Sequence, residues 1–302
     1  MIYRQLSRYS LEDIKNAIIA MPNKNIVYAC IASFCGYFAL SSYDFLALKY
    51  IKRKIAVWKW MFAGFLGFAV SNNAGHAIVS GGAVRYRLYT RWRLSATDIV
   101  KMVTFSGFTY LIACFFLVIV GLLCSPQHVL SSLSSRYINW TMMLLSICGL
   151  LFYLWGCSFY RKTIVIKDIE FTTPSLKLAI AQIFIGGADI LMASLVLYFL
   201  MKSTIEIPFF TFIGVFIIAQ MLGIYSQVPG GLGVFEVVFT NLLPNDEDQA
   251  KLFAILILYR IIYYLLPLTI SGIALFIYEF EWHEQKLYKK IKKRVDKSKD
   301  TL

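Results

Sequence analysis

The chain has 302 residues, of which 59% are hydrophobic and only 16% carry a charge. A soluble domain carries charge on about a quarter of its residues. The apolar residues here fall into blocks of roughly 20, the length that a helix needs to cross a bilayer. This composition excludes a soluble enzyme, a disordered tail and a disulfide-rich secreted module.

Positive charge dominates, with 30 Lys and Arg residues against 17 Asp and Glu and a formal net charge of +13. In a soluble protein such an excess would first suggest nucleic-acid binding. The basic residues instead cluster in the short loops between apolar blocks, and no nucleic-acid motif is present. We therefore expect them to orient the chain in the membrane and to contact anionic lipid headgroups, and we expect no nucleic acid among the partners.

Residues 1–25 are predicted to form an amphipathic helix on the membrane surface. A capping-box pattern begins at Ser10, and apolar side chains at helical spacing continue to Met21, immediately before Pro22. No basic region leads directly into an apolar core with a small-residue cleavage site, so this segment does not read as a cleavable signal peptide.

Residues 26–280 are expected to form a single transmembrane domain, followed by a basic cytoplasmic tail at 281–302. Seven apolar blocks are each long enough to cross a hydrocarbon core of about 30 Å. They are 26–47, 57–80, 97–123, 138–157, 175–201, 208–228 and 250–279. Two short segments, 81–92 and 231–243, follow Gly-rich breaks and are too short or too charged to cross alone.

Loop charge predicts the orientation of the blocks, because Lys and Arg concentrate on the cytoplasmic side. Loops rich in bases are 49–54, 85–93, 161–167 and the tail, whereas those poor in bases are 124–137, 202–207 and 241–251. The N-terminus then lies outside, which suggests that a first helix is missing or that the chain has another start.

Two regions, 57–92 and 208–243, have both of their ends on one side of the membrane in this orientation. Each is therefore predicted to enter and return as a re-entrant hairpin, and the two hairpins open to opposite faces. Many transporters form a site near the membrane midplane from discontinuous helices in such an inverted arrangement. The expected fold is an all-α polytopic membrane protein with about seven membrane-crossing or broken helices.

The densest polar stretch lies in the first hairpin, at 71–89. Asn72, Asn73 and His76 are tolerated at membrane depth only where they face protein or a wet cavity. Gly81 and Gly82 would present backbone N–H groups beside Arg85 and Arg87, a combination suited to a phosphate. The alternatives are that the arginines only anchor the chain at the cytoplasmic surface, and that His76 packs rather than relays protons.

The second polar stretch, 225–236, contains Gln227, Pro229, Gly230, Gly231 and Glu236. Pro229 and the glycines favour a sharp break between two helices, with Glu236 near the start of the second, where the helix dipole stabilises a carboxylate. The glycine spacing is neither a dinucleotide fingerprint nor a Walker loop.

Asp44, Asp189 and Arg260 are ionisable residues inside apolar blocks. An isolated charge at the bilayer centre costs about 2.5 to 3.5 kcal/mol, so Asp189 and Arg260 should be paired or solvated. Glu236 is the favoured partner of Arg260, and Asp189 is the alternative. Either pair could be structural or functional. No catalytic motif and no carboxylate cluster for a metal occurs, so we expect no cofactor and no metal.

The two hairpins resemble the transmembrane domain of bacterial lysylphosphatidylglycerol synthetase/flippase proteins and a related stand-alone inner-membrane family. The matching stretches are 71–94, with its Gly-Gly-Ala-Val-Arg-Tyr-Arg-Leu-Tyr core, 228–236 and 259–267. The resemblance covers about residues 10–281. In two-part members this domain moves aminoacylated phosphatidylglycerol between leaflets, and a separate soluble domain transfers the amino acid from tRNA. The resemblance thus implies a flippase domain without the synthetase, whose lipid path is lined by Arg85, Arg87, Gly230, Gly231, Glu236 and Arg260.

The leading hypothesis is a lipid flippase of the bacterial inner membrane that moves an anionic or aminoacylated phospholipid between leaflets. The alternatives are a non-transporting scaffold for a separately encoded lipid-modifying enzyme and, less favoured, an intramembrane lipid-modifying enzyme. Whether the chain forms a homo-oligomer stays open. The candidate substrate-binding residues are Asn72, Asn73, His76, Arg85, Arg87, Gln227, Gly230, Gly231, Glu236 and Arg260.

Overall fold

The computed structural model describes residues 19, 21–74, 77–124, 136–159, 163–166, 168–202, 207–242 and 249–299. The expected surface helix at 1–25 therefore lies almost entirely outside the described residues. The first long helix, α3, runs from Asn23 to Tyr50, and Pro22 occupies its N-cap position.

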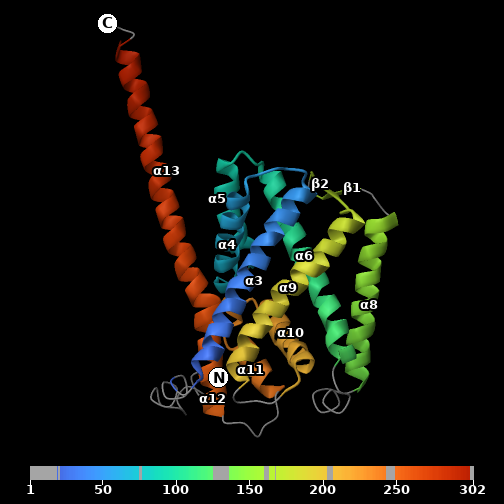
Figure 1. Cartoon of the computed structure of the whole chain (residues 1–302). Helices are drawn as coiled ribbons and strands as arrows, with labels where there is room; N and C mark the ends of the chain where they lie inside the picture. Colours follow the sequence, from blue (N-terminus) through green and yellow to red (C-terminus); the bar gives the residue numbers. More distant parts are fainter. Residues whose placement is uncertain are drawn as a thin grey trace.

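The chain is an all-α polytopic membrane protein. Five helices of the described part are long and apolar enough to cross a membrane. Four of them are α3, α6 (Ala96–Cys124), α8 (Arg136–Phe159) and α9 (Leu176–Met201). The fifth is built from α12 (Gln249–Arg260), the π-helical turn η2 (Ile261–Leu265) and α13 (Leu266–Lys299). The segment expected as a basic tail continues α13 as a helix that projects beyond the bundle (Figure 1).

The two remaining apolar blocks fold back on themselves as helix–break–helix units. In the first, α4 (Val57–Asn73) is followed by α5 (Ala77–Arg91), and the two helices pack together. In the second, α10 (Phe209–Tyr225) leads through the 3₁₀ turn η1 (Pro229–Gly231) into α11 (Val234–Asn241). The α4/α5 unit lies toward the end from which α13 projects, and the α10/α11 unit lies toward the opposite end (Figure 1).

The break in the first unit is not where the glycines predicted it. Gly81 and Gly82 lie inside α5, so their N–H groups belong to a helix and are not presented to a ligand. Gly81 is needed for packing, because a Cβ there would lie 2.7 Å from the carbonyl oxygen of Gly67 and 2.9 Å from Cβ of Ser71. The second break is where it was predicted, at Pro229–Gly231.

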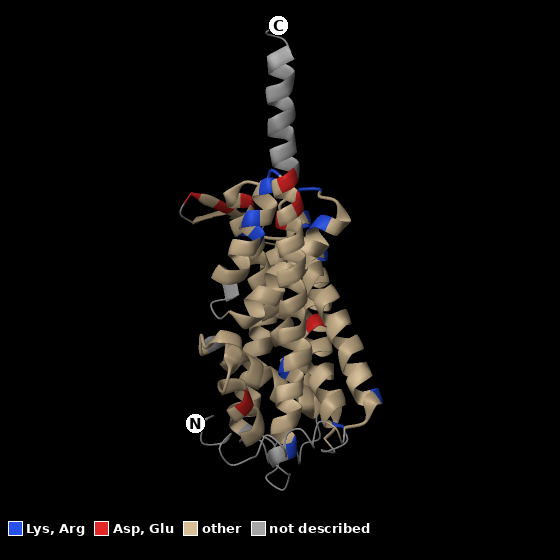
Figure 2. Cartoon of the chain, turned by 90° about the vertical axis from the view of Figure 1, so that its left-hand side faces the viewer, with Lys and Arg blue, Asp and Glu red and all other residues tan. Residues whose placement is uncertain are grey.

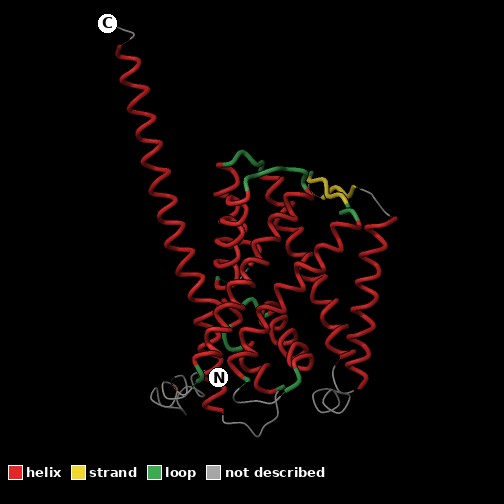
Figure 3. Tube along the Cα trace, viewed as in Figure 1, coloured by secondary structure: helices red, strands yellow, loops and turns green. Residues whose placement is uncertain are grey.

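The expected cytoplasmic loops gather at one end of the molecule. Charged residues concentrate at the end from which α13 projects (Figure 2). A small antiparallel hairpin, β1 (Thr163–Ile166) with β2 (Ile169–Thr172), also lies there (Figure 3). Sequence inspection treated this segment only as a basic loop. Two four-residue strands are too short to show a clear alternation of apolar and polar side chains.

The interior of the bundle is organised around α3, which packs along α9 and also contacts α4 and α6. One apolar cluster joins the end of α3 to α4, α5 and the start of α6, with Leu46, Leu66, Leu88 and Met102 fully buried. A larger cluster joins α9, α10, α11 and α12 to the start of α3. The two hairpins are therefore each packed into a core of their own.

The π-helical turn in the fifth helix has a clear chemical cause. The N–H of Leu266 bonds to the carbonyl of Ile261, five residues back, and Pro267 has no N–H to offer. The carbonyls of Ile262 and Tyr263 consequently lose their helical donors. Ser33 donates to the first at 3.2 Å and Tyr37 to the second at 3.0 Å, so α3 completes the backbone of this turn.

Candidate functional site

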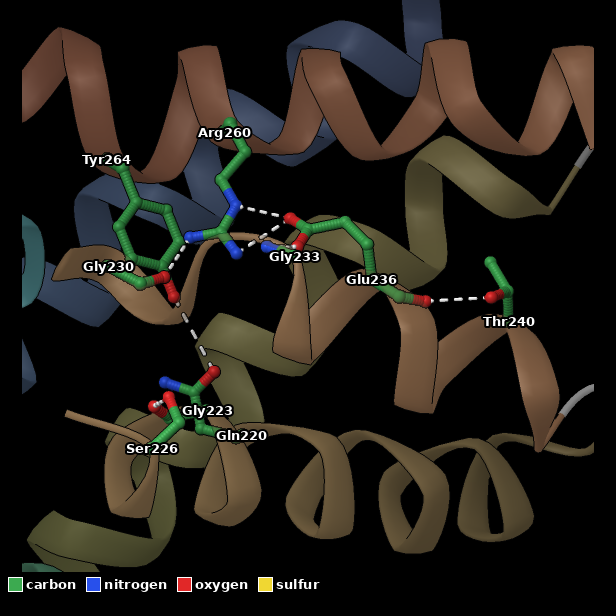
Figure 4. Close-up of polar contacts among 9 residues, drawn as sticks. All are labelled: Gln220, Gly223, Ser226, Gly230, Gly233, Glu236, Thr240, Arg260 and Tyr264. Carbon is green, nitrogen blue, oxygen red and sulfur yellow. Dashed lines mark hydrogen bonds and ion pairs between the residues drawn. The ribbon is translucent and has the colours of Figure 1, made fainter. Parts of the chain in front are cut away.

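Arg260 and Glu236 form the central ion pair of the second hairpin (Figure 4). Nε and Nη2 of Arg260 both lie 2.7 Å from Oε1 of Glu236. The other carboxylate oxygen, Oε2, accepts the N–H of Gly233 at 2.7 Å. Glu236 thus caps the N-terminus of α11 and links it to Arg260 of α12 at the same time. The pairing of Arg260 that the sequence favoured is the one observed.

Arg260 also holds the break before α11. Its Nη1 donates to the carbonyl of Gly230, and its guanidinium lies 4.6 Å from the ring centre of Tyr264. Gly230 and Gly231 have φ angles of 59° and 60°, which residues other than glycine rarely adopt. Gln227 adopts a similar φ of 58° at the start of the turn. The glycines therefore shape a turn that one arginine fastens.

The tips of the two hairpins meet at this turn. A Cβ on Gly230 would lie 3.5 Å from the carbonyl oxygen of Asn72, the penultimate residue of α4. Asn73 donates through Nδ2 to the carbonyl of Tyr264 at 3.2 Å, which ties the same tip to the π-helical turn. Tyr264 in turn reaches Oε1 of Gln220 on α10 at 3.5 Å (Figure 4). The arrangement agrees with two opposed hairpins that meet inside the bundle.

Arg85 is not a surface anchor, because it is buried in an ion pair with Asp44 of α3. Its Nε lies 2.9 and 3.1 Å from the two carboxylate oxygens of Asp44, and the hydroxyl of Tyr89 donates to Oδ2 at 2.8 Å. The Asp44 side chain is fully buried and that of Arg85 is 4% exposed. The guanidinium also lies 4.2 Å from the ring centre of Phe68. Sequence reasoning missed this pair, although Asp44 was visible as an ionisable residue in an apolar block.

Arg87, the neighbouring candidate, points elsewhere. Its Nε lies 2.8 Å from Oε1 of Glu279 on α13, and Nη2 of Arg91 lies 2.7 Å from the other oxygen of the same carboxylate. The Arg87 side chain is 60% exposed. These contacts fasten α5 to α13 near the charged end of the molecule, so Arg85 and Arg87 do not converge on one phosphate.

A cavity of about 500 Å³ lies between the two hairpins, within the usual size range of small-molecule sites. Helices α3, α4, α5, α6, α9 and α10 and the π-helical turn all contribute to its wall. The polar part of the wall includes Asn72, Arg85, Asp189 and Gln220. On the α6 and α10 side the lining residues Phe108 and Ile224 are exposed at the surface of the bundle. The cavity thus combines a buried polar wall with an apolar rim.

Asp189 does not pair with Arg260, so the alternative pairing was wrong. Oδ2 of Asp189 instead accepts the hydroxyl of Tyr43 at 2.9 Å. Asn72 lies near the same wall, and its Nδ2 is 3.5 Å from the hydroxyl of Tyr37. Among the ion pairs between described residues, Asp189 has no Lys or Arg partner.

The candidate residues therefore fall into separate places. Asn72 and Arg85 line the cavity, whereas Glu236, Arg260 and Gly230 form the adjoining cluster that shapes the second hairpin. Asn73 joins that cluster, Gly231 and Gln227 belong to the turn, and Arg87 lies apart. His76 lies outside the described residues. Within the described part, no group of three or more His, Cys, Asp or Glu side chains could hold a metal.

Comparison with known proteins matches the chain along most of its length. A family model described as the lysylphosphatidylglycerol synthase TM region matches residues 1–271. The chain is 30% identical to an uncharacterized protein of Synechocystis, over 94% of this chain and 88% of that protein. It is 28% identical to inner membrane protein YbhN of Escherichia coli, over 81% of this chain and 77% of YbhN.

The chain is also 27% identical to a phosphatidylglycerol lysyltransferase of Staphylococcus xylosus. That match covers 93% of this chain but only 32% of the lysyltransferase, so the similarity concerns one part of that larger protein. Because the family model covers most of the chain, including both hairpins, the cavity and the Arg85–Asp44 and Arg260–Glu236 pairs, the chain belongs to the lysylphosphatidylglycerol synthase transmembrane-region family.

Proposed function

We propose that the chain is a flippase that moves an anionic or aminoacylated phospholipid of the phosphatidylglycerol type between leaflets of the bacterial inner membrane. The observation that carries this proposal is the cavity between the two opposed hairpins, with a buried polar wall and an apolar rim. A lipid headgroup needs polar partners to leave the water, whereas its acyl chains can stay in the bilayer.

The names of the relatives support the choice of substrate and membrane. One is called an inner membrane protein and another a phosphatidylglycerol lysyltransferase. Lys and Arg residues gather at the end of the bundle from which α13 projects, and this supports a cytoplasmic location for that end and for the C-terminal part of α13 (Figure 2). On this proposal the partners are membrane lipids, and the chain needs no enzymatic activity of its own.

Leaflet exchange in reconstituted liposomes tests the proposal. The purified chain is incorporated into liposomes with headgroup-labelled phosphatidylglycerol, and the fraction of label reached by an external quencher is followed over time. We expect exchange well above that of protein-free liposomes. The double variant Asp44→Asn with Arg85→Gln removes a buried ion pair whose arginine lines the cavity, without leaving a lone buried charge. We expect it to slow exchange by about tenfold or more.

The matched control is Arg53→Gln with Asp98→Asn, which removes an ion pair of 3.3 Å at an exposed arginine. We expect this control to exchange lipid like the wild type, and thermal unfolding checks that both double variants are folded. Wild-type exchange no faster than in empty liposomes, across several anionic and aminoacylated lipids, would remove the flippase proposal. It would leave a scaffold that serves a separately encoded lipid-modifying enzyme.

A further inference from the structure

We infer that lipid movement through the cavity is coupled to proton movement, and that Asp189 is the group that takes up and releases the proton. This inference rests on the proposed function, because it takes the cavity as the route of a lipid. It goes further in naming a second transported species, which supplies the driving force.

Three acidic side chains inside the bundle differ in their partners. Asp44 is paired with Arg85, and Glu236 is paired with Arg260. Asp189 is 3% exposed, lies midway along α9, lines the cavity and pairs with no Lys or Arg among the described residues. A lone carboxylate at this depth is costly, and binding of a proton removes its charge. Asp189 therefore stands where a carboxyl can serve as a proton carrier.

The titratable groups around Asp189 are hydroxyls and one thiol. Oδ2 of Asp189 accepts the hydroxyl of Tyr43 at 2.9 Å. The side chains that interact with the Asp189 carboxyl come from α3, α6 and the π-helical turn, and they are Tyr37, Tyr43, Tyr110, Cys114 and Tyr263. Tyrosine and cysteine side chains are ordinarily uncharged near neutral pH, so none of these groups balances an ionised Asp189.

The charged side chains on the neighbouring elements are already balanced. Helix α5 contributes Arg85 to the cavity wall, and Asp44 meets its charge. Helix α12, which packs on α9, ends at Arg260, and Glu236 meets its charge. Helices α8 and α10 also pack on α9 and bring no charged side chain to the described part of the wall. Proton uptake at Asp189 is therefore the step that removes the uncompensated charge from the cavity.

Buried polar groups continue from Asp189 behind the cavity wall. A Cβ on Gly186 would lie 3.2 Å from the hydroxyl of Tyr43 and 3.0 Å from the carbonyl oxygen of Thr109. The hydroxyl of Thr109 accepts Nε2 of Gln182 at 2.7 Å, and both side chains are buried. Gln182 precedes Asp189 by seven residues and so lies roughly 10 Å nearer the start of α9, at the end from which α13 projects (Figure 1). The carboxyl thus has polar neighbours both in the cavity and toward that end.

Charge balance links the proton to an anionic lipid. The phosphate of phosphatidylglycerol brings a negative charge, which an ionised Asp189 in the same cavity would repel. A proton bound to an oxygen of the Asp189 carboxylate removes this repulsion and leaves again to water after the lipid has crossed, with no other bond made or broken. Each species therefore favours binding of the other, and the two are expected to cross in the same direction.

Liposomes under a proton gradient test the inference. The purified full chain is reconstituted with a trace of headgroup-labelled phosphatidylglycerol, and valinomycin with equal potassium on both sides holds the membrane potential at zero. Buffers hold the proton concentration outside about tenfold above that of the lumen, so one proton per lipid should concentrate the label about tenfold in the inner leaflet. The share of label that an external quencher reaches should fall from about half to about a tenth. This distribution is an equilibrium property, so the orientation of the inserted chains does not affect it.

The variant arm uses Asp189→Asn, which keeps an oxygen acceptor for Tyr43 but cannot take up a proton. We expect it to lose the asymmetry, and we expect Asp98→Asn, outside the cavity, to keep it. Protein-free liposomes under the same gradient give the baseline, and thermal unfolding checks that the variants are folded. A lipid-soluble carbodiimide, which reacts with protonated carboxyls, provides a second test in the wild type. Peptide mass spectrometry should find its adduct at Asp189.

The outcomes separate this inference from the proposed function. Wild-type chains that exchange lipid but leave it evenly distributed would overturn the coupling and keep the flippase. Asymmetry of the opposite sign would overturn the shared direction. Asymmetry that persists in Asp189→Asn, or a wild type without an adduct at Asp189, would overturn the role of that residue. A chain that exchanges no lipid would lose the flippase and the coupling together.

Discussion

Tyr37 donates a 3.0 Å hydrogen bond to the backbone carbonyl of Tyr263, 226 residues further along the chain. That carbonyl would bond to the N–H of residue 267 in an ordinary α-helix, but residue 267 is a proline. The side chain of one spanning helix thus replaces a backbone donor that another helix lacks. The contact explains how an interrupted helix can remain buried.

Tyr37→Phe should destabilise the protein, because it removes this donor and leaves the carbonyl buried without a partner. The expected cost is about 1 to 3 kcal/mol. Thermal unfolding in detergent, followed by tryptophan fluorescence, measures it. Tyr28→Phe is the matched control, since Tyr28 is half-exposed and its ring packs against Phe199 in a tilted arrangement. Equal melting temperatures for the two variants would show that the bond is not needed.

Asp44→Asn should be among the most damaging single changes in the chain. It leaves the guanidinium of Arg85 buried without its counterion, which costs about 3 to 5 kcal/mol. Asp98→Asn breaks an exposed pair with Arg53 and should cost less than about 1 kcal/mol. Melting temperature and yield of folded protein distinguish the two.

Addition of Arg85→Gln to Asp44→Asn should recover part of the lost stability, because no lone buried charge then remains. A double variant at least as unstable as the sum of the two single variants would contradict the assignment of a coupled buried pair. This comparison needs the two single variants and the double variant in the same detergent.

Gly81→Ala should disturb the packing of α5 on α4, because the new Cβ would lie 2.7 Å from the carbonyl oxygen of Gly67. The expected cost is about 1 to 3 kcal/mol. The neighbouring Gly82→Ala is the matched control, since its Cβ would meet only a methyl group of Val103 at 3.9 Å. A helix gains stability when alanine replaces an unconstrained glycine, so this control should be neutral or slightly stabilising. A reversed order of melting temperatures would refute the close approach.

Arg260→Lys should loosen the turn before α11 although the charge is kept. A lysine cannot bond to the Glu236 carboxylate through two nitrogens and to the Gly230 carbonyl at once. Backbone amides at 230–236 should exchange with deuterated solvent about tenfold faster. Arg53→Lys, at an exposed pair, should leave these amides unchanged. Unaltered exchange in Arg260→Lys would mean that the turn does not depend on the guanidinium.

Much of the fold could be predicted from the sequence, because the solvent imposes simple rules on it. Apolar blocks of sufficient length indicated the membrane-crossing helices, and the loop charges predicted that two of the blocks fold back as hairpins. The break at Pro229 could also be predicted, since proline and glycine interrupt helices. The pairing of Glu236 with Arg260 could be predicted because the two residues stand in segments that follow one another along the chain.

The remaining features depend on contacts that no local pattern reveals. Asp44 and Arg85 pair across 41 residues, and Arg85 stands in a run of basic residues typical of a membrane surface. The π-helical turn depends on which carbonyls find partners on α3. As a glycine, Gly81 suggested a break in the helix, but in the structure it allows a close contact between two helices. Only the position of Gly67 in the folded chain reveals this role.

The fifth helix is fastened to both hairpins at very different distances from its wide turn. Arg260 holds α11 immediately before the turn, whereas Glu279 holds Arg87 and Arg91 of α5 roughly 20 Å beyond it. The contact with the second hairpin therefore lies at the turn, and the contact with the first hairpin lies far from it. A bend of about 10° at the turn would carry Glu279 through about 4 Å and leave Arg260 almost in place, so the first hairpin would swing while the second stayed still.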